Sequence, residues 1–410
     1  MIAGMASTGE DVAQGHTFHQ DGLTGFRALA AAWVMAFHLN AFAVPKVIPV
    51  RVFGAEFSLH PLLTAGWVGV DLFFVLSGFL LATHLMEALA RGRPGALRRY
   101  FIARARRVFP AYWAQLLLLF VAAVWAAKAI PEWAGYIPLH IPMLHFVSER
   151  ASFSINAVYW TLPIELSFYL SLPVIAICLL RAERRGGAAS WLMLFGLYCA
   201  ILVLVWCYRY AMFRHFETSP VNVIVWATSQ LPGTLDVFMA GVVAATVLRW
   251  AKARSAPWRR SRERLVSTAL AILGLAGIVG MMYFIDQLYG VYWKGHWALF
   301  VWHSITAVFI AMLVGGIAIS GPLTRALFET RVMVFLGTIS YSVYLWHYPI
   351  GLWAMRAFDA PGIGVAAFCA LTVPLVLAAS ALSYYLVERP FLRKSAAPAS
   401  GVRGAGEINP

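Results

Sequence analysis

The sequence predicts an all-α protein, a polytopic membrane bundle of about ten transmembrane helices. Of its 410 residues, 61% are hydrophobic and only 12% are charged, and the mean hydropathy is +0.73. Water-soluble globular domains carry roughly twice that charged fraction. Ten apolar runs are also long enough to cross a bilayer, which takes about 20 helical residues. These features exclude a water-soluble globular protein.

The apolar runs follow one another along the chain with short connections. They lie near residues 25–44, 62–86, 109–130, 160–180, 190–212, 222–248, 266–286, 296–320, 332–355 and 361–387. Because the chain has no repeats or long linkers, we expect one transmembrane domain at 21–394. A polar cytoplasmic N-terminal arm at 1–20 precedes it and a flexible cytoplasmic tail at 395–410 follows it. The first 24 residues contain neither Lys nor Arg, so we expect the first run itself, and not a cleaved signal peptide, to direct insertion.

Basic residues alternate between the two sides of the predicted bundle. The loops at 86–108, 181–189, 249–265 and 321–331, together with the tail, hold 23 Lys and Arg, whereas the alternate loops hold 8, Arg209 among them. Because loops rich in Lys and Arg stay in the cytoplasm, both termini are predicted to be cytoplasmic. The net charge of +14 then needs no nucleic-acid partner, since basic loops also meet anionic lipid.

Two ionisable residues, Arg27 and His38, interrupt the first apolar run. At about 100° and 1.5 Å per residue, they share one helix face and lie about 16 Å apart along the axis. Ionisable residues inside a membrane are candidates for a functional site by default. The alternative is that Arg27 reaches the lipid headgroups and His38 is a hydrogen-bonded core residue.

The second run, GWVGVDLFFVLSGFLLATH, carries an acid and a pair of small residues. Asp71 needs a partner in the bilayer, and a buried carboxylate is well suited to orienting a histidine. We therefore assign Asp71 to a polar site, with a purely structural buried pair as the alternative. Ser77 and Gly78 are interpreted as small residues that let helices pack closely.

Two arginines, Arg104 and Arg107, lie three residues apart where the third run begins. On a helix this spacing places them on one face, where forked guanidinium groups can bind a phosphate. The alternative is that they only signal topology, like the other basic residues of this loop.

Further polar residues lie in later runs. Glu165, in YWTLPIELSFYL, is an acid that needs a partner, and Asp236 is another. The string GTISYSVYLWHYPI places Tyr341, Ser342 and His347 in the ninth run.

The outer loop at 131–158 is rich in proline and aromatic residues, which favours an ordered structure at the membrane interface. It contains His140 and His145, but no carboxylate or third histidine stands at ligand spacing, so no metal site is predicted. The cysteines have no CxxC spacing and are interpreted as small core residues, neither disulfide-bonded nor metal ligands. They are Cys178, Cys199, Cys207 and Cys369.

Four strings in order make the chain similar to a known family. GVDLFFVLSGF, RRVFPAYW, YWTLPIELSFYL and ISYSVYLWHYP follow an Arg and a His separated by ten residues. Over residues 20–394 they resemble the acyltransferase-3 family of integral-membrane O-acyltransferases. The resemblance implies transfer of an acyl group, most often acetyl, from acetyl-CoA or another acyl-coenzyme A to a hydroxyl of a carbohydrate or other cell-envelope acceptor. It also implies the bacterial inner membrane and no tightly bound cofactor.

The resemblance assigns roles to residues by their positions in the matched motifs. The implied catalytic residues are His38, Arg27, Asp71 and Glu165, and the implied coenzyme A ligands are Arg104, Arg107 and Arg27. After the glutamate, many relatives have a second acid and a glutamine, where this chain has Leu166 and Ser167. Some relatives continue into an extracytoplasmic hydrolase-like domain, and we expect any such activity here on another polypeptide.

These residues suggest a mechanism. Coenzyme A is expected to enter from the cytoplasm, with its phosphates on the arginines and its pantetheine arm along the face shared by Arg27 and His38. His38 then deprotonates the acceptor hydroxyl or accepts the acyl group first, and the sequence does not separate the two. Asp71 or Glu165 is expected to hold its imidazole in the useful tautomer.

Two other functions are alternatives. A proton-coupled transporter of a sugar or lipid also uses buried ionisable residues, but we find no inverted repeat with broken helices at matching positions. A non-catalytic subunit of an envelope polysaccharide machine predicts that Arg27 and His38 can be changed without loss. The sequence does not specify the acceptor, the acyl chain length or the oligomeric state.

Overall fold

The computed structural model describes residues 20–43, 49–52, 55–254, 260–358 and 360–396. The expected N-terminal arm and the end of the tail lie outside these residues. Within them, nine helices are long and apolar enough to span a membrane. In chain order, the long helices are α1 (Gln20–Phe42), α3 (Val68–Ala90), α4 (Ala96–Ala127), α7 (Thr161–Arg185), α8 (Gly187–Phe216), α10 (Leu231–Arg254), α11 (Arg260–Gln287), α13 (Ala298–Ile319) and α18 (Val365–Ser383).

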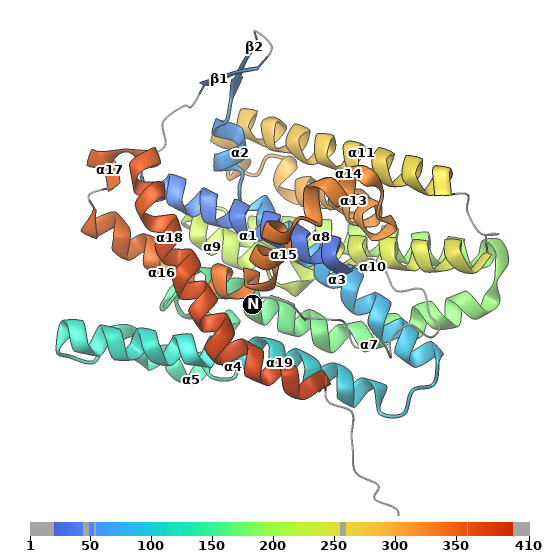
Figure 1. Cartoon of the computed structure of the whole chain (residues 1–410), viewed down its shortest axis with the longest axis horizontal. Coiled ribbons are helices and arrows are strands. Elements are labelled where there is room, and N and C mark those ends of the chain that lie inside the picture. Colours follow the sequence, from blue (N-terminus) through green and yellow to red (C-terminus); the bar gives the residue numbers. More distant parts are fainter. Residues whose placement is uncertain (1–19, 44–48, 53–54, 255–259, 359, 397–410) are drawn as a thin grey trace, which may run out of the picture.

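The all-α membrane bundle is therefore confirmed. Most long helices lie roughly side by side, with α1 and α3 between α11 and α13 on one side and α4 and α19 on the other (Figure 1). Short helices connect them, and β1 (Pro49–Val52) and β2 (Ala55–Ser58) form an antiparallel hairpin that projects from the bundle. The shorter α-helices are α2 (His60–Thr64), α5 (Ile137–His140), α6 (Glu149–Phe153), α9 (Val221–Thr228), α12 (Tyr289–Tyr292), α14 (Pro322–Phe328), α15 (Arg331–Thr338), α16 (Ser340–Ala357), α17 (Ala360–Ile363) and α19 (Arg389–Ala396).

Several expected boundaries change. The ninth run is broken at Ile339 into α15 and α16, and the sixth is divided between α9 and α10. The third helix begins at Ala96 instead of 109, so the loop expected at 86–108 is much shorter and Arg104 and Arg107 lie within α4, as their helical spacing predicted. Charged residues suggested a loop there, but Arg and Ala are strong helix formers. A π-helical turn, η4 (Tyr384–Glu388), joins α18 to α19.

Glycines allow the central helices to approach one another closely. A Cβ on Gly78 would lie 2.1 Å from the backbone oxygen of Phe238, so any side chain there would separate α3 from α10. The close-packing interpretation is confirmed for Gly78. Ser77 has an additional contact, since its hydroxyl donates a hydrogen bond to Glu165 of α7. The core interpretation of the cysteines is also wrong for Cys178, Cys199 and Cys207, which are exposed on the bundle surface, where lipid is as apolar as a protein core.

A buried ion pair holds three helices together. Arg209 was expected in an outer loop, but it lies in α8 with only 2% of its surface exposed. Its guanidinium is 2.9 Å from Asp236 of α10 and also donates to the backbone oxygens of Gly233 and Phe300. Ser304 of α13 donates to the other oxygen of Asp236. The count of basic residues by loop assigned Arg209 to an outer loop, but a carboxylate on another helix compensates its charge and allows it to be buried.

Asp236→Asn is expected to destabilise the bundle by about 3–5 kcal/mol, because it leaves the buried charge of Arg209 uncompensated. Thermal unfolding of the purified protein in detergent measures the effect. Glu217→Gln is the matched control, since it breaks the exposed 2.6 Å pair with Arg214, which is worth at most about 1 kcal/mol. Equal stability of the two variants would contradict a structural role for the buried pair.

Candidate active site

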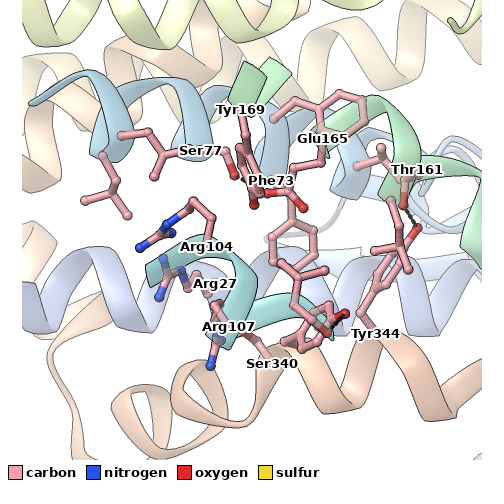
Figure 2. Close-up of a pocket in the computed structure, with 17 residues that line it drawn as sticks. Arg27, Phe73, Ser77, Arg104, Arg107, Thr161, Glu165, Tyr169, Ser340 and Tyr344 are labelled. Atoms are coloured by element: carbon pink, nitrogen blue, oxygen red, sulfur yellow. Dashed lines mark hydrogen bonds between the residues drawn. The ribbon is translucent and has the colours of Figure 1, made fainter. Parts of the chain in front are cut away.

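A cavity of about 100 Å³ lies among α1, α3, α4, α7 and α16. We call it the arginine cavity, because Arg27, Arg104 and Arg107 gather at one end of it (Figure 2). Glu165 of α7 lines its wall, and Tyr344 of α16 lies at the end away from the arginines. The structure thus brings four of the predicted site residues together.

The arginine cavity has more positive than negative groups. Arg107 is 2.9 Å from Glu388, which also accepts a hydrogen bond from Ser342. Glu165 accepts a hydrogen bond from Ser77 over 2.8 Å. Arg104 keeps a buried Nε without a hydrogen-bond partner in the described part of the chain. Three guanidinium groups therefore face two carboxylates, and an unsatisfied donor remains, as expected of a site for an anion.

A second cavity, of about 300 Å³, adjoins the first. We call it the histidine cavity, because His38 and His303 both line it. Val70, Phe74 and Tyr344 line both cavities and form the partition between them. Helix α1 accordingly carries Arg27 to one cavity and His38 to the next. Asp71, Arg209 and several aromatic side chains complete the lining, among them Phe37, Trp67, Trp160, Tyr289, Tyr292 and Trp293.

Hydrogen bonds define the tautomer of His38. Its Nδ1 is 3.0 Å from the backbone oxygen of Val34 and 3.2 Å from Nε2 of His347. Nδ1 of His347 is likewise 3.0 Å from the backbone oxygen of Val343. Because a carbonyl oxygen only accepts, both Nδ1 atoms carry the hydrogen, and Nε2 of His347 accepts from His38. This assignment leaves Nε2 of His38 with a free lone pair, which a base or nucleophile requires.

The two predicted acids do not hold His38. Asp71 lies 2.8 Å from Nδ1 of His303, a residue that sequence analysis did not single out. Glu165 accepts its hydrogen bond from Ser77 instead. Ser77 follows Asp71 by six residues on α3, which places the two about 9 Å apart along the helix axis. The expectation that either acid orients His38 is therefore corrected. Backbone oxygen and a second histidine do so instead, because these acids have nearer partners.

Pro349 and the hydrogen bonds that compensate for it fix the position of His347. Pro349 has no N–H, so the backbone oxygen of Leu345 in α16 loses its helical partner. Gln115 and Asn156 donate to that oxygen over 2.7 and 3.1 Å, and Tyr159 in turn donates to Gln115. This buried network fixes the turn that carries His347 toward His38.

The outer loop is ordered, as expected. Short helices, including η1 (Glu132–Tyr136), η2 (His145–Val147) and η3 (Ala157–Trp160), build it. The rings of His140 and His145 stack with centroids 4.1 Å apart, and each donates Nε2–H to a backbone oxygen. Among the described residues, no group of three or more potential metal ligands gathers. The pair thus has a structural environment, buried and neutral.

This environment predicts a pH-sensitive loop. Burial lowers the pKa of His140 to about 4, and burial together with His140 lowers the pKa of His145 to about 3. The unfolded loop, with pKa values near 6.5, binds protons that the folded loop does not, so stability falls as the pH drops from about 6.5 toward 4. Hydrogen exchange of residues 137–154 should accelerate by up to about tenfold per pH unit for each histidine, after correction for intrinsic rates. Unchanged protection across that range would contradict this.

Comparison with known proteins identifies the family. A family model described as an acyltransferase domain matches residues 20–385. The O-acetyltransferase OatA of Staphylococcus aureus (strain NCTC 8325 / PS 47) is 25% identical over 393 residues, covering 91% of this chain and 57% of OatA. The peptidoglycan O-acetyltransferase OatA of Listeria monocytogenes is 26% identical over 342 residues, covering 80% of this chain and 49% of that protein.

The chain spans about half the length of these curated relatives. No solved structure matches it significantly. The family model, however, covers nearly all of the membrane bundle, including both cavities. The chain therefore belongs to the acyltransferase-3 family of integral-membrane proteins.

Proposed function

We propose that this protein is a membrane O-acyltransferase. It moves an acyl group, most often acetyl, from acyl-coenzyme A to a hydroxyl of a carbohydrate or other cell-envelope acceptor. The observation that carries the proposal is the pair of adjoining cavities, one cationic and one with the free Nε2 of His38 at its wall. Family membership and relatives named O-acetyltransferases support it.

The arginine cavity is proposed to bind the donor. Coenzyme A is an anion with a thin pantetheine arm, and Arg27, Arg104 and Arg107 supply forked donors for its phosphates. The arm then passes the partition at Tyr344, so that the thioester meets His38. The positive-inside bias supports cytoplasmic termini and places the arginine ends of α1 and α4 toward the cytoplasm, where acyl-coenzyme A is made.

The histidine cavity is proposed to bind the acceptor. Its aromatic rings can stack on the apolar faces of sugars, and its charged groups can bind hydroxyls. Relatives named for peptidoglycan support a cell-wall glycan as the acceptor. Nε2 of His38 acts at the acyl carbon, as a base for the attacking hydroxyl or as the first acceptor of the acyl group. A transporter is not favoured, because the family is one of acyltransferases.

The test uses detergent-purified protein, radiolabelled acetyl-CoA and a crude glycan and lipid extract. We expect covalent label in the extract, at a rate that saturates with acetyl-CoA. Absence of both transfer and saturable coenzyme A binding would overturn the proposal and favour transport.

A further inference from the structure

We propose that His303, held by Asp71, is the base that removes the proton of the acceptor hydroxyl, while His38 receives the acyl group first. This inference rests on the proposed function and assigns two steps to two histidines of one cavity. It starts from the observation that the structure gives these histidines different partners.

His303 has the environment of a general base. Asp71 Oδ2 accepts from its Nδ1 over 2.8 Å, which leaves the lone pair on Nε2. The carboxylate is 7% exposed, whereas the His303 side chain is 28% exposed and lines the cavity. A buried carboxylate stabilises the imidazolium that forms when the ring takes a proton. The Tyr292 hydroxyl lies 3.4 Å from Nε2, so this atom is within reach of a hydroxyl group, and the acceptor must displace or share that contact.

His38 has the environment of a neutral nucleophile. Its Nδ1–H is held by the Val34 oxygen and by His347, and neither of the two acids predicted for this role bonds to it. A histidine without an anionic partner gains little as a proton acceptor. Its free Nε2 can still attack a thioester, and the hydrogen bonds that Nδ1–H donates to Val34 and His347 stabilise the acyl-imidazolium that forms.

The two steps balance. First, Nε2 of His38 attacks the thioester carbonyl, the carbon–sulfur bond breaks, and coenzyme A leaves as the thiolate, while His38 keeps its Nδ1 proton as an acyl-imidazolium. Second, the acceptor hydroxyl gives its proton to Nε2 of His303 as its oxygen attacks the acyl carbon. The carbon–nitrogen bond to His38 then breaks, the ester is released, and His38 returns to the neutral imidazole with its proton on Nδ1. The proton on His303 finally neutralises the thiolate through solvent.

The aromatic lining favours a ring-bearing polyol as the acceptor. Trp67 stacks nearly parallel to Tyr289 and Tyr292, with interplanar angles of 27° and 20°. These rings lie in the same cavity as His303, so a sugar against them presents a hydroxyl near that base. If the Asp71–His303 pair only tied α3 to α13, its removal would lower stability without separating the two steps.

The experiment measures the two steps separately in purified protein. Exchange of label between coenzyme A and acetyl-CoA, without acceptor, reports the first step, and label in the glycan reports both. We expect His303→Gln and Asp71→Asn to keep exchange within about twofold and to lower transfer by about 10²–10⁴. His38→Ala should lose both. Hydroxylamine, which needs no base, should take the acyl group from the His303→Gln variant at nearly the wild-type rate.

Several results would overturn the inference. They are transfer retained by His303→Gln, exchange and transfer falling together in Asp71→Asn, and transfer without exchange in the wild type. Failure of the proposed function looks different, because the wild type itself would then show neither exchange nor transfer. His84→Ala is the matched histidine control, since His84 is exposed and lines neither cavity.

Discussion

His38→Ala is expected to lower acyl transfer by about 10³–10⁴, because it removes the nitrogen that acts at the acyl carbon. Nε2 of His38 carries the free lone pair in the structure, and no other group of α1 lines the histidine cavity with comparable chemistry. The measurement is label transferred from acetyl-CoA to a glycan extract by equal amounts of folded protein.

His84→Ala supplies the matched control for this change. His84 makes the same type of hydrogen bond to the backbone oxygen four residues earlier, Leu80, over 2.7 Å, but it lies outside both cavities. It should retain wild-type transfer. Comparable size-exclusion profiles and melting temperatures would show that both variants fold. Transfer by His38→Ala at the level of His84→Ala would contradict the assigned role.

Arg104→Gln is expected to raise the Kd for coenzyme A by about 10-fold to 100-fold with a smaller effect on kcat. The reason is that hydrogen bonds to charged groups contribute about 1.5–3 kcal/mol each. Arg104 is the informative single change, because among the described residues its Nε has no hydrogen-bond partner and its guanidinium forms no ion pair. Titration calorimetry of the purified protein with coenzyme A measures the Kd.

Arg107→Gln should weaken coenzyme A binding as well, but it also leaves the buried Glu388 without its cation. Its melting temperature should therefore fall, whereas that of Arg104→Gln should not. Arg106→Gln is the control, since this neighbouring residue does not line the arginine cavity. An unchanged Kd in the double variant of Arg104 and Arg107 would remove these residues from the donor site.

The helical bundle could be predicted from sequence, and so could six residues that line the two cavities: Arg27, His38, Asp71, Arg104, Arg107 and Glu165. Apolar runs report helices directly, and helical periodicity fixes which residues share a face. Helical spacing placed Arg104 and Arg107 on one face, whereas their grouping with Arg27 came from the resemblance to the acyltransferase-3 family. The structure brings these three residues and Glu165 to one cavity. Their roles in binding and catalysis stay predictions.

Pairing between helices could not be predicted, because a single sequence does not state which helices are neighbours. His303 on α13 was missed as the partner of Asp71, and Glu388 as the partner of Arg107. The sequence did offer a signal for both partners. Like Asp71, His303 and Glu388 are ionisable residues inside or at the edge of an apolar run. Arg209 was misplaced for the same reason, since only its contact with Asp236 explains its burial.

The most direct test of an acyltransferase that depends on His38 is transfer of labelled acetyl from acetyl-CoA to a cell-wall glycan in proteoliposomes. Wild type, His38→Ala and His84→Ala are compared at equal protein. We predict covalent label in the glycan with wild type and His84→Ala, and none above background with His38→Ala. Equal labelling by all three variants, or glycan uptake without covalent label, would contradict it.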